Sequence, residues 1–561
     1  MQHLATVSRA NNLLALTNQQ FDVLVIGGGV TGAGVALDAA ARGYSVALVE
    51  KNDFASGTSS KSTKLVHGGI RYLPSFDIAM VQEGLVERGI LLRNAPHLVK
   101  PLGFVLPIYG SDRHPVGMPF TTPGGIGLDI LLDMGLWAYD TLAGKWGIQR
   151  HRRLARKTVL EYMPDLVTDD LKGGFIYYDG QTNDARLTIA LIQSAIQIGA
   201  VVTNHTEMQS FIKQNDQVVG VHMCDTLTDA TFTIQARHIV NATGVYAEQI
   251  EMLTGVPPQA HIEPSKGVHL VLSRDDLKLG DAAVVLPETK DKRILFIVPW
   301  QSRIVFGTTD TGTGDLDNPT VSSDDIDYLL TYLNHYLSVK LTRDDIISTY
   351  AGYRPLVKPS STGKQRSTAQ LSRTHTVLQG SSGLLSIIGG KLTTYRRMAQ
   401  DTVDIISQRD HKKLINPTVD LPLAGGTGWP QGKEQLYQQG IARGISAFSM
   451  NHLLDSYGTE TGTIIEIVGE QQDLAQQLIS DLPYIRAEVL FACHYEMAMT
   501  PEDFLARRTA ITLEDRQRGA GIVADVVALQ AQEYHWSDAY QQQLIQRYQS
   551  MMKQQMAIPV R

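Results

Sequence analysis

The chain has 561 residues, of which 43% are hydrophobic and 19% are charged, and its formal net charge is −7. This length exceeds what one hydrophobic core fills, so about two or three domains are expected, and the composition excludes a disordered chain. The net negative charge argues against nucleic acid as a partner. The only cysteines, Cys224 and Cys493, lie far apart, which indicates no disulfide framework and favours a reducing, cytoplasmic location.

The sequence predicts neither a metal site nor a membrane span. His222 with Cys224 and Cys493 with His494 do not belong to clusters with ligand spacing. Residues 1–20 lack the apolar core of a signal peptide. The most apolar run, residues 126–142, is interrupted by three aspartates, so we expect the chain to be soluble or to lie on a membrane surface.

Residues 21–50 predict a dinucleotide site. A short apolar strand at 21–26 leads into the spacing G-x-G-x-x-G, made by Gly27, Gly29 and Gly32. An alanine-rich helix at 33–41 and a second strand at 45–49 follow, and Glu50 comes next. The glycines allow a tight turn and a close approach to a pyrophosphate, the helix N-terminus attracts phosphate, and a carboxylate at this distance can bind ribose hydroxyls.

The next stretch, KNDFASGTSSKSTKLVHGGIRYL, is too polar for a core element. Its hydroxyl groups and backbone N–H groups suit phosphate and flavin edges, and a solvated loop is the alternative. It follows the nucleotide motif directly, and no acid separates the basic residues Lys61, Lys64, His67 and Arg71.

Helical spacing predicts a helix at 77–94, and a strand at 104–109 and a loop at 110–125 follow. Residues 126–144 are apolar with spaced acids, and six basic residues follow between 145 and 157. The residues alone favour a core helix and a solvated basic loop. The alternative is an apolar and basic face that rests on anionic lipid.

A helix at 183–198 and a strand through Val202 come next, and β-rich runs at 209–240 are expected to return to the nucleotide-binding sheet. A strand from residue 239 ends at Gly244. Strand patterns at 268–272, 294–298, 303–308 and 346–353 follow without long helices between them, which predicts an antiparallel second sheet facing the substrate. After a strand at 384–388, Gly389 and Gly390 are expected to open a helix at 391–403. From about Gly425 the composition predicts a separate helical domain, whose Arg507–Arg508 pair is surface charge or an interdomain contact.

Several motifs together resemble one enzyme family. They are GGGVTGAG at 27–34, TSSKSTKLVHGGIRYL at 58–73, NDARLTIAL at 183–191, HIVNATGVYA at 238–247, KGVHLVL at 266–272, PWQSRIVFGTTDT at 299–311, AGYRPL at 351–356 and IIGGKLTTYRRMA at 387–399. The set resembles the FAD-dependent glycerol-3-phosphate dehydrogenases, well over about residues 20 to 410 and more loosely to about 540.

The resemblance implies an α/β fold with three parts. They are a discontinuous, Rossmann-like FAD-binding domain (20–75, 158–260 and 360–410), an antiparallel-sheet substrate domain (76–157 and 261–359) and a C-terminal helical domain (425–550). It also implies oxidation of sn-glycerol 3-phosphate at C2 to dihydroxyacetone phosphate, with electrons passed to a quinone at the inner face of the cell membrane. Three alternatives stay open: an oxidase using O2, an amine or amino-acid oxidase on the same fold, and a flavin-binding protein without turnover. The oligomeric state also stays open, a homodimer included.

Oxidation of a phosphorylated alcohol by a flavin needs fixed cations for the phosphate and a group that takes the hydroxyl proton. The resemblance assigns substrate contacts to Arg71, Tyr72, His269, Arg354 and Lys391. Among these, His269 is the candidate base, Arg71 and Arg354 are the candidate phosphate ligands, and His269, Arg354 and Lys391 are expected to be catalytic. The expected FAD contacts are Gly27, Gly29, Gly32, Glu50, Thr58, Ser59, Ser60, Lys64, His67, Gly68, Gly244, Gly390, Leu392 and Thr393. Tyr353 replaces the small aliphatic residue that the family more often has before the arginine, which can alter the pocket's shape.

Overall fold

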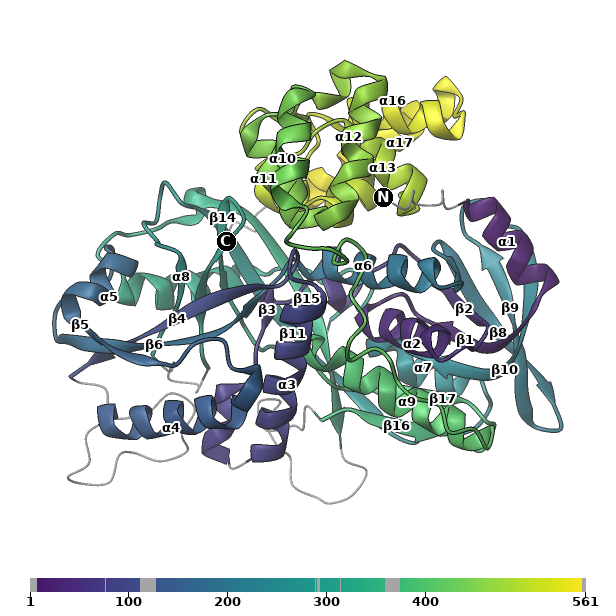
Figure 1. Cartoon of the computed structure of the whole chain (residues 1–561), viewed down its shortest axis with the longest axis horizontal. Helices are drawn as coiled ribbons and strands as arrows, with labels where there is room; N and C mark the ends of the chain where they lie inside the picture. The colour runs from purple at the N-terminus through teal and green to yellow at the C-terminus, as the bar shows by residue number, and fades with distance from the viewer. Residues whose placement is uncertain are drawn as a thin grey trace.

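The computed structural model describes residues 8–75, 77–110, 128–287, 289, 293–312, 314–358 and 374–556. In them the chain forms two β-sheets, here called sheet A and sheet B, and the C-terminal helices gather at one end of the molecule (Figure 1).

Sheet A contains the strands of the predicted nucleotide site. Its order is β16-β17-β10-β1-β2-β7, with β9 paired to β10 and β8 to β9. The centre of the sheet, from β17 to β7, is parallel, as the prediction of a Rossmann-like domain requires. The strands are β1 (Gln20–Ile26), β2 (Val46–Val49), β7 (Val201–Thr203), β8 (Thr206–Gln214), β9 (Gln217–Asp225), β10 (Thr231–Asn241), β16 (Thr376–Gln379) and β17 (Leu385–Ile388).

The central strands of sheet A bury apolar side chains on both faces, so each face needs a covering layer. Three helices cover one of these faces. α2 (Val30–Ala41), α6 (Asp184–Gln197) and α9 (Tyr395–Arg409) share a core with β1. The short α1 (Arg9–Asn18) packs Leu16 into the core of the opposite face. The predicted helix at 391–403 is displaced: a 3-10 turn, η7 (Leu392–Thr394), comes first, and α9 then continues to Arg409.

Sheet B has the order β15-β11-β14-β13-β12-β4-β6-β3, with β5 paired to β6. Its described pairs are antiparallel, as predicted, apart from the parallel pair β12–β4. The strands are β3 (Leu65–Val66), β4 (Lys100–Tyr109), β5 (Arg152–Ala155), β6 (Leu171–Gln181), β11 (His261–Ser273), β12 (Ala282–Val285), β13 (Phe296–Trp300), β14 (Arg303–Gly307) and β15 (Ile346–Lys358).

The expectation that no long helix interrupts these strands was wrong, because α8 (Ser323–Tyr336) lies between β14 and β15. Ser322 and Asp325 form a capping box at its start. Its buried residues Ile326, Leu329 and Leu333 recur at helical spacing and pack against the sheet B face that carries Leu270.

The chain crosses between the sheets more often than the predicted domain ranges assume. β3 and β6 lie within ranges assigned to the FAD-binding domain, yet both pair in sheet B. The domain boundaries therefore stay a prediction.

The C-terminal helices share a core with the other face of sheet B, through Val271, Val298 and Tyr350. They are α10 (Lys433–Ala442), α11 (Ala447–Tyr457), α12 (Thr461–Glu470), α13 (Ala487–Tyr495), α14 (Pro501–Asp503), the π-helical turn η10 (Phe504–Arg508), α15 (Ile511–Glu514), α16 (Val523–Tyr534) and α17 (Asp538–Met556).

The remaining helices are α3 (Ile78–Asn94), α4 (Leu128–Ala143), α5 (Arg156–Tyr162) and α7 (Ala247–Met252). α4 lies at the side of the molecule away from the C-terminal helices (Figure 1). The predicted loop at 110–125 falls almost wholly outside the described residues. Among the described helices, none combines the length and apolar character needed to cross a membrane.

Candidate functional site

The glycine motif forms the turn between β1 and α2. Gly27 has φ +109°, and a β-carbon there would lie 2.7 Å from the carbonyl oxygen of Ala242. A β-carbon on Gly32 would lie 1.9 Å from the carbonyl oxygen of Gly27, so only glycine allows this contact. Gly29 precedes the first turn of α2 and has no capping side chain. The turn therefore leaves a helix N-terminus at the cavity wall, which suits a pyrophosphate.

Glu50 follows β2 and holds the loop around the motif. Its two carboxylate oxygens accept hydrogen bonds from the backbone N–H groups of Gly28 (2.7 Å) and Asn52 (2.9 Å). Burial raises the pKa of Glu50, although these two hydrogen bonds act in the opposite direction. Glu50 lines the cavity, and a carboxylate has further lone pairs with which to accept ribose hydroxyls.

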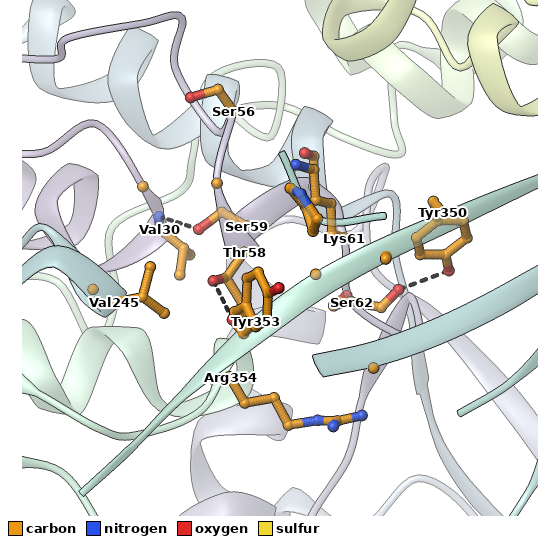
Figure 2. Close-up of a pocket in the computed structure, with 18 of the residues that line it drawn as sticks. Val30, Ser56, Thr58, Ser59, Lys61, Ser62, Val245, Tyr350, Tyr353 and Arg354 are labelled. Atoms are coloured by element: carbon orange, nitrogen blue, oxygen red, sulfur yellow. Dashed lines mark hydrogen bonds between the residues drawn. The ribbon is translucent and has the colours of Figure 1, made fainter. Parts of the chain in front are cut away.

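The hydroxyl-rich segment lies in η1 (Thr58–Ser60), between α2 and β15 (Figure 2). Ser59 Oγ accepts a hydrogen bond from the N–H of Val30 at 2.9 Å, and Thr58 Oγ1 donates to the carbonyl oxygen of Tyr353 at 2.6 Å. Thr58, Ser59 and Ser60 all line the cavity.

Lys64 and Gly68 lie behind this wall and are not among the described residues that line the cavity. The Lys64 ammonium is buried and pairs with Asp184 at 2.6 Å. A β-carbon on Gly68 would lie 2.5 Å from Leu85 and from the Tyr139 hydroxyl, so the glycine serves close packing. His67 does line the cavity, and its N–H donates to Thr393 Oγ1 at 3.1 Å.

The second glycine turn reaches the cavity at its other wall. Gly389 and Gly390 have φ of +74° and +81°, which favours glycine. The residues from Gly389 to Thr393 line the cavity, as does Gly244, whose φ is +60°.

These segments enclose one continuous cavity of about 2250 Å³. Its wall includes Glu50, Met208 and Leu227 as well as residues of the sheet B strands β11 and β15. This volume exceeds that of an ordinary small-molecule pocket, about 300–1,000 Å³, so a dinucleotide and a substrate can be held together. The glycine turn, helix N-terminus and carboxylate therefore fit FAD in an extended form.

His269 lies on β11 in the wall formed by sheet B. Its ring stacks on Tyr350, with centroids 4.7 Å apart, and its Nε2 is 3.0 Å from Thr63 Oγ1. Its Nδ1 is buried and has no hydrogen-bond partner in the described structure. Burial, followed by the charges of Arg354 and Lys64, holds the pKa of His269 well below its usual range, so the ring is neutral at neutral pH.

Arg354 reaches from β15 across Gly267 of β11. Its guanidinium donates to Thr308 Oγ1 at 2.9 Å, and it lies 3.9 Å from Asp310. A β-carbon on Gly267 would lie 2.4 Å from Arg354 Nη2, so the glycine makes room for the guanidinium. Gly267 and His269 are two residues apart on one strand and share a face, so the guanidinium and the imidazole lie within about 7 Å along the strand.

Lys391 and Tyr72 face each other in the wall of the same cavity. The Lys391 ammonium lies 4.2 Å from the centre of the Tyr72 ring, in cation–π geometry. Both residues line the cavity together with His269 and Arg354. The side chain of Arg71, which the sequence also assigned here, lies outside the described part of the structure.

Three further residues at this end were not predicted: Thr63, Tyr350 and Arg293. Arg293 donates to the carbonyl oxygen of Asp310 at 2.6 Å. Thr63 lies in the polar stretch after Glu50, so the composition of that stretch indicated the segment that contains it. Tyr350 and Arg293 carry no local signal, because the pairing of distant strands brings them to the site.

Comparisons with known proteins agree with this geometry. Residues 22–396 match the family model described as FAD dependent oxidoreductase, and residues 416–541 match the C-terminal domain of alpha-glycerophosphate oxidase. The chain is 36% identical over 539 residues to glycerol-3-phosphate dehydrogenase 2 of Mycobacterium tuberculosis, covering 96% of this chain and 88% of that protein. It is 37% identical to the human mitochondrial glycerol-3-phosphate dehydrogenase, covering 96% of this chain and 74% of the human one.

A solved structure extends the likeness to the whole fold. The glycerol-3-phosphate dehydrogenase from Bacillus halodurans, complexed with FAD, superposes with a TM-score of 0.80 at 31% identity and covers 100% of both chains. The resemblance predicted from the motifs is confirmed, and FAD is the cofactor. With its nucleotide-binding turn, its enclosed cavity and these relatives, the chain belongs to the family of FAD-dependent glycerol-3-phosphate dehydrogenases.

Proposed function

We propose that this enzyme oxidises sn-glycerol 3-phosphate at C2 to dihydroxyacetone phosphate and passes the electrons to a quinone. The observation that carries the proposal is the pairing of a neutral, buried imidazole with a guanidinium on the same strand face, at one end of the FAD cavity. Arg354 is suited to bind the phosphate, because a guanidinium pairs with phosphate in a bidentate manner. His269 Nδ1 lacks a partner and is suited to accept the C2 hydroxyl proton.

Arg354 and His269 then act on different groups of the substrate. The phosphate held at Arg354 directs the C2 hydroxyl toward His269, while the Lys391 ammonium supports the negative charge that develops on the C2 oxygen. When bound, FAD supplies the acceptor for the hydride that leaves C2. Loss of that hydride and of the hydroxyl proton leaves the ketone, so the atoms and electrons balance.

The phosphate assignment is tested by Arg354→Gln. We expect kcat/KM for sn-glycerol 3-phosphate to fall about 100-fold, because a charged hydrogen-bonding group is lost, while the flavin spectrum is retained. Slow reduction by glycerol, which carries no phosphate, should be the same in both proteins. Arg343→Gln, which removes a guanidinium that pairs with Asp327 outside the cavity, is the matched control. An Arg354→Gln enzyme with unchanged kcat/KM would exclude the phosphate role.

The acceptor is tested under anaerobic conditions. The holoenzyme is reduced with sn-glycerol 3-phosphate, and a quinone analogue or air-saturated buffer is then mixed in. Rapid return of the oxidised flavin band with the quinone and slow return with air would support the dehydrogenase. Rapid return with air would make the enzyme an oxidase, and bleaching by an amino acid but not by glycerol 3-phosphate would favour the amine-oxidase alternative.

We also propose that α4 rests on an anionic membrane surface. Ile130, Met134 and Trp137 follow each other at helical spacing and expose 55%, 65% and 65% of their surfaces. Each acid of α4 contacts a basic side chain: Asp129 pairs with Arg153, and Asp133 and Asp140 contact His151. The basic side chains of Lys145, Arg150 and Arg152 are exposed nearby. An apolar stripe beside positive charge is typical of helices that lie in a lipid interface.

This surface is tested by cosedimentation with vesicles of phosphatidylcholine and phosphatidylglycerol. Met134→Ser combined with Trp137→Ser should reduce binding about tenfold, because two apolar side chains leave the interface. Phe448→Ser changes an apolar side chain of similar exposure on α11, among the C-terminal helices, and should leave binding unchanged. Equal loss in both variants would exclude α4 as the contact.

A further inference from the structure

The cavity extends beyond the substrate end to the C-terminal helices. We call this extension the C-terminal chamber. It is lined by Lys61 from the segment after η1 and by residues of η10, α17 and their neighbours, among them Glu502, Asp503, Arg507, Arg518 and Arg547. Apart from Arg507, which the sequence left as surface charge or an interdomain contact, none of these residues was assigned a role above.

Lys61 enters this chamber without an ion pair in the described structure, although the charge of Glu502 acts on its ammonium. Its stem lies against Gly352 of β15, where an added β-carbon would be 2.6 Å from Lys61 Cβ. Within the described residues its ammonium has no ion pair or hydrogen bond, and Figure 2 shows it between η1 and β15, away from Arg354. Burial and then the nearby Arg507 lower the pKa of Lys61 to about 8.

Arg518 is a second cation without an acid. Only 6% of its surface is exposed, and its guanidinium donates to the carbonyl oxygens of Thr349 (2.9 Å) and Thr512 (3.4 Å). No carboxylate pairs with it in the described structure. Burial lowers its pKa. A buried guanidinium is costly without an anion, so a ligand that supplies one is favoured here.

The acids of the chamber are already engaged. Glu502 and Asp503 both pair with Arg507, at 3.2 Å and 2.8 Å, and Asp503 also contacts His205. Asp53, which also lines the cavity, pairs with Arg507 and Arg508. Lys61, Arg518 and the exposed Arg547 have no carboxylate paired with them in the described structure, and apolar side chains such as Leu544 and Met552 complete the wall.

We propose that the C-terminal chamber is a second anion-binding site, which takes the phosphate or carboxylate group of a small metabolite. Lysine and arginine side chains together provide the charge-assisted hydrogen bonds that such groups need. The proposal does not depend on the phosphate clamp at Arg354. Arg518 bonds to Thr349, the neighbour of the Tyr350 ring that stacks on His269, so the site adjoins the strand that supports the candidate base.

The first test uses inorganic phosphate and the wild-type holoenzyme. Lysines are acetylated near the pKa of Lys61, about pH 8, in phosphate or in chloride of equal ionic strength, and mass spectrometry gives the rate at each site. Saturating phosphate should slow acetylation of Lys61 about tenfold, because the bound anion holds the ammonium form, and should leave exposed Lys553 unaffected. Equal rates at Lys61 in both buffers would overturn the proposal. A parallel arm in acetate separates a preference for phosphate from one for carboxylate.

Calorimetry of phosphate binding provides the second test. The wild-type holoenzyme should bind phosphate at two sites, and Lys61→Gln should weaken one of them about tenfold, while the control Lys553→Gln keeps both. Arg354→Gln should remove the other site. Loss of a site in Lys61→Gln but not in Arg354→Gln would support the chamber and exclude the clamp. Identical isotherms for wild type and Lys61→Gln would overturn the proposal, and if Lys61→Gln fails to fold, the acetylation of the wild type decides.

Discussion

Thr63 is the only described side chain within hydrogen-bonding distance of His269. We expect its hydroxyl to accept from Nε2–H, which leaves the lone pair on Nδ1, an atom without a partner in the described structure. Thr63→Val removes the acceptor, so kcat should fall about tenfold with little change in KM, and Thr63→Ser should restore it. Steady-state kinetics with the flavin spectrum as a folding control give the answer. A Thr63→Val enzyme with wild-type kcat would show that the hydroxyl does not set the tautomer.

Residues whose roles depend on local backbone were predictable from the sequence. Gly27, Gly29 and Gly32 form a turn within six consecutive residues, where Gly32 meets the carbonyl oxygen of Gly27, although the contact of Gly27 with Ala242 is not local. The contact between Thr63 and His269 joins positions 206 residues apart, so neither neighbour appears in the other's local pattern. Lys64 was predicted as a flavin contact, and the structure places its ammonium against a buried aspartate of α6, outside the described lining of the cavity.

At the scale of the elements, α6 contacts the C-terminal helices through a carboxyl group whose charged form is disfavoured by burial. Glu460, in the turn before α12, accepts from Gln197 of α6 at 3.1 Å. Burial, and next the charge of Glu496, raise its pKa to about 8. Since the folded pKa lies above the unfolded value of 4.5, the folded state loses stability as pH rises from 4.5 to about 8.

Glu460→Gln should remove this loss and keep the bond from Gln197. The variant should match the wild type in thermal stability near pH 4.5 and exceed it by about 2 kcal/mol at pH 8 or above. Thermal denaturation midpoints of the two proteins across this range give the direction of the difference and its dependence on pH. Glu434→Gln, at an exposed position of α10, should change little at any pH. A Glu460→Gln enzyme less stable than wild type at pH 8 would mean that the charged carboxylate is needed there.

The sequence predicted where helices and strands lie along the chain better than which strands pair and which helices pack on them. The periodicities of α3, α6 and many strands of both sheets are visible in short windows, because each buries one stripe or face, whereas β5, β6, β12 and β16 were not predicted. The membership of β6 in sheet B and the position of α8 over that sheet depend on long-range pairing, so the sequence could not establish either.

Across the whole molecule, one ionic cluster joins the C-terminal helices to the loop after β2. The sequence left Arg507 and Arg508 as surface charge or an interdomain contact, and the second alternative is correct, because both guanidinium groups pair with Asp53. Asp53, His205 and Asp503 bring potential metal ligands within 4.8 Å of one another. The two arginines already neutralise these carboxylates, so the cluster is explained as an ion network without a metal.

Arg508→Met tests whether this cluster fixes the C-terminal helices in place. The side chains of Arg508 and Asp53 are fully buried, and Arg508 also donates to the carbonyl oxygen of Glu496 at 3.2 Å. Methionine preserves much of the volume but leaves Asp53 with one guanidinium, so we expect a loss of about 3 kcal/mol. Arg397→Met, which breaks an exposed pair with Asp401, should cost less than about 1 kcal/mol.

Because a chain of several domains does not unfold in one step, the readout is limited proteolysis of residues 410–432, which precede α10. Faster cleavage there in Arg508→Met than in Arg397→Met would mean that the helices detach as a unit. Equal cleavage would mean that the apolar core shared with sheet B holds them without the ion network.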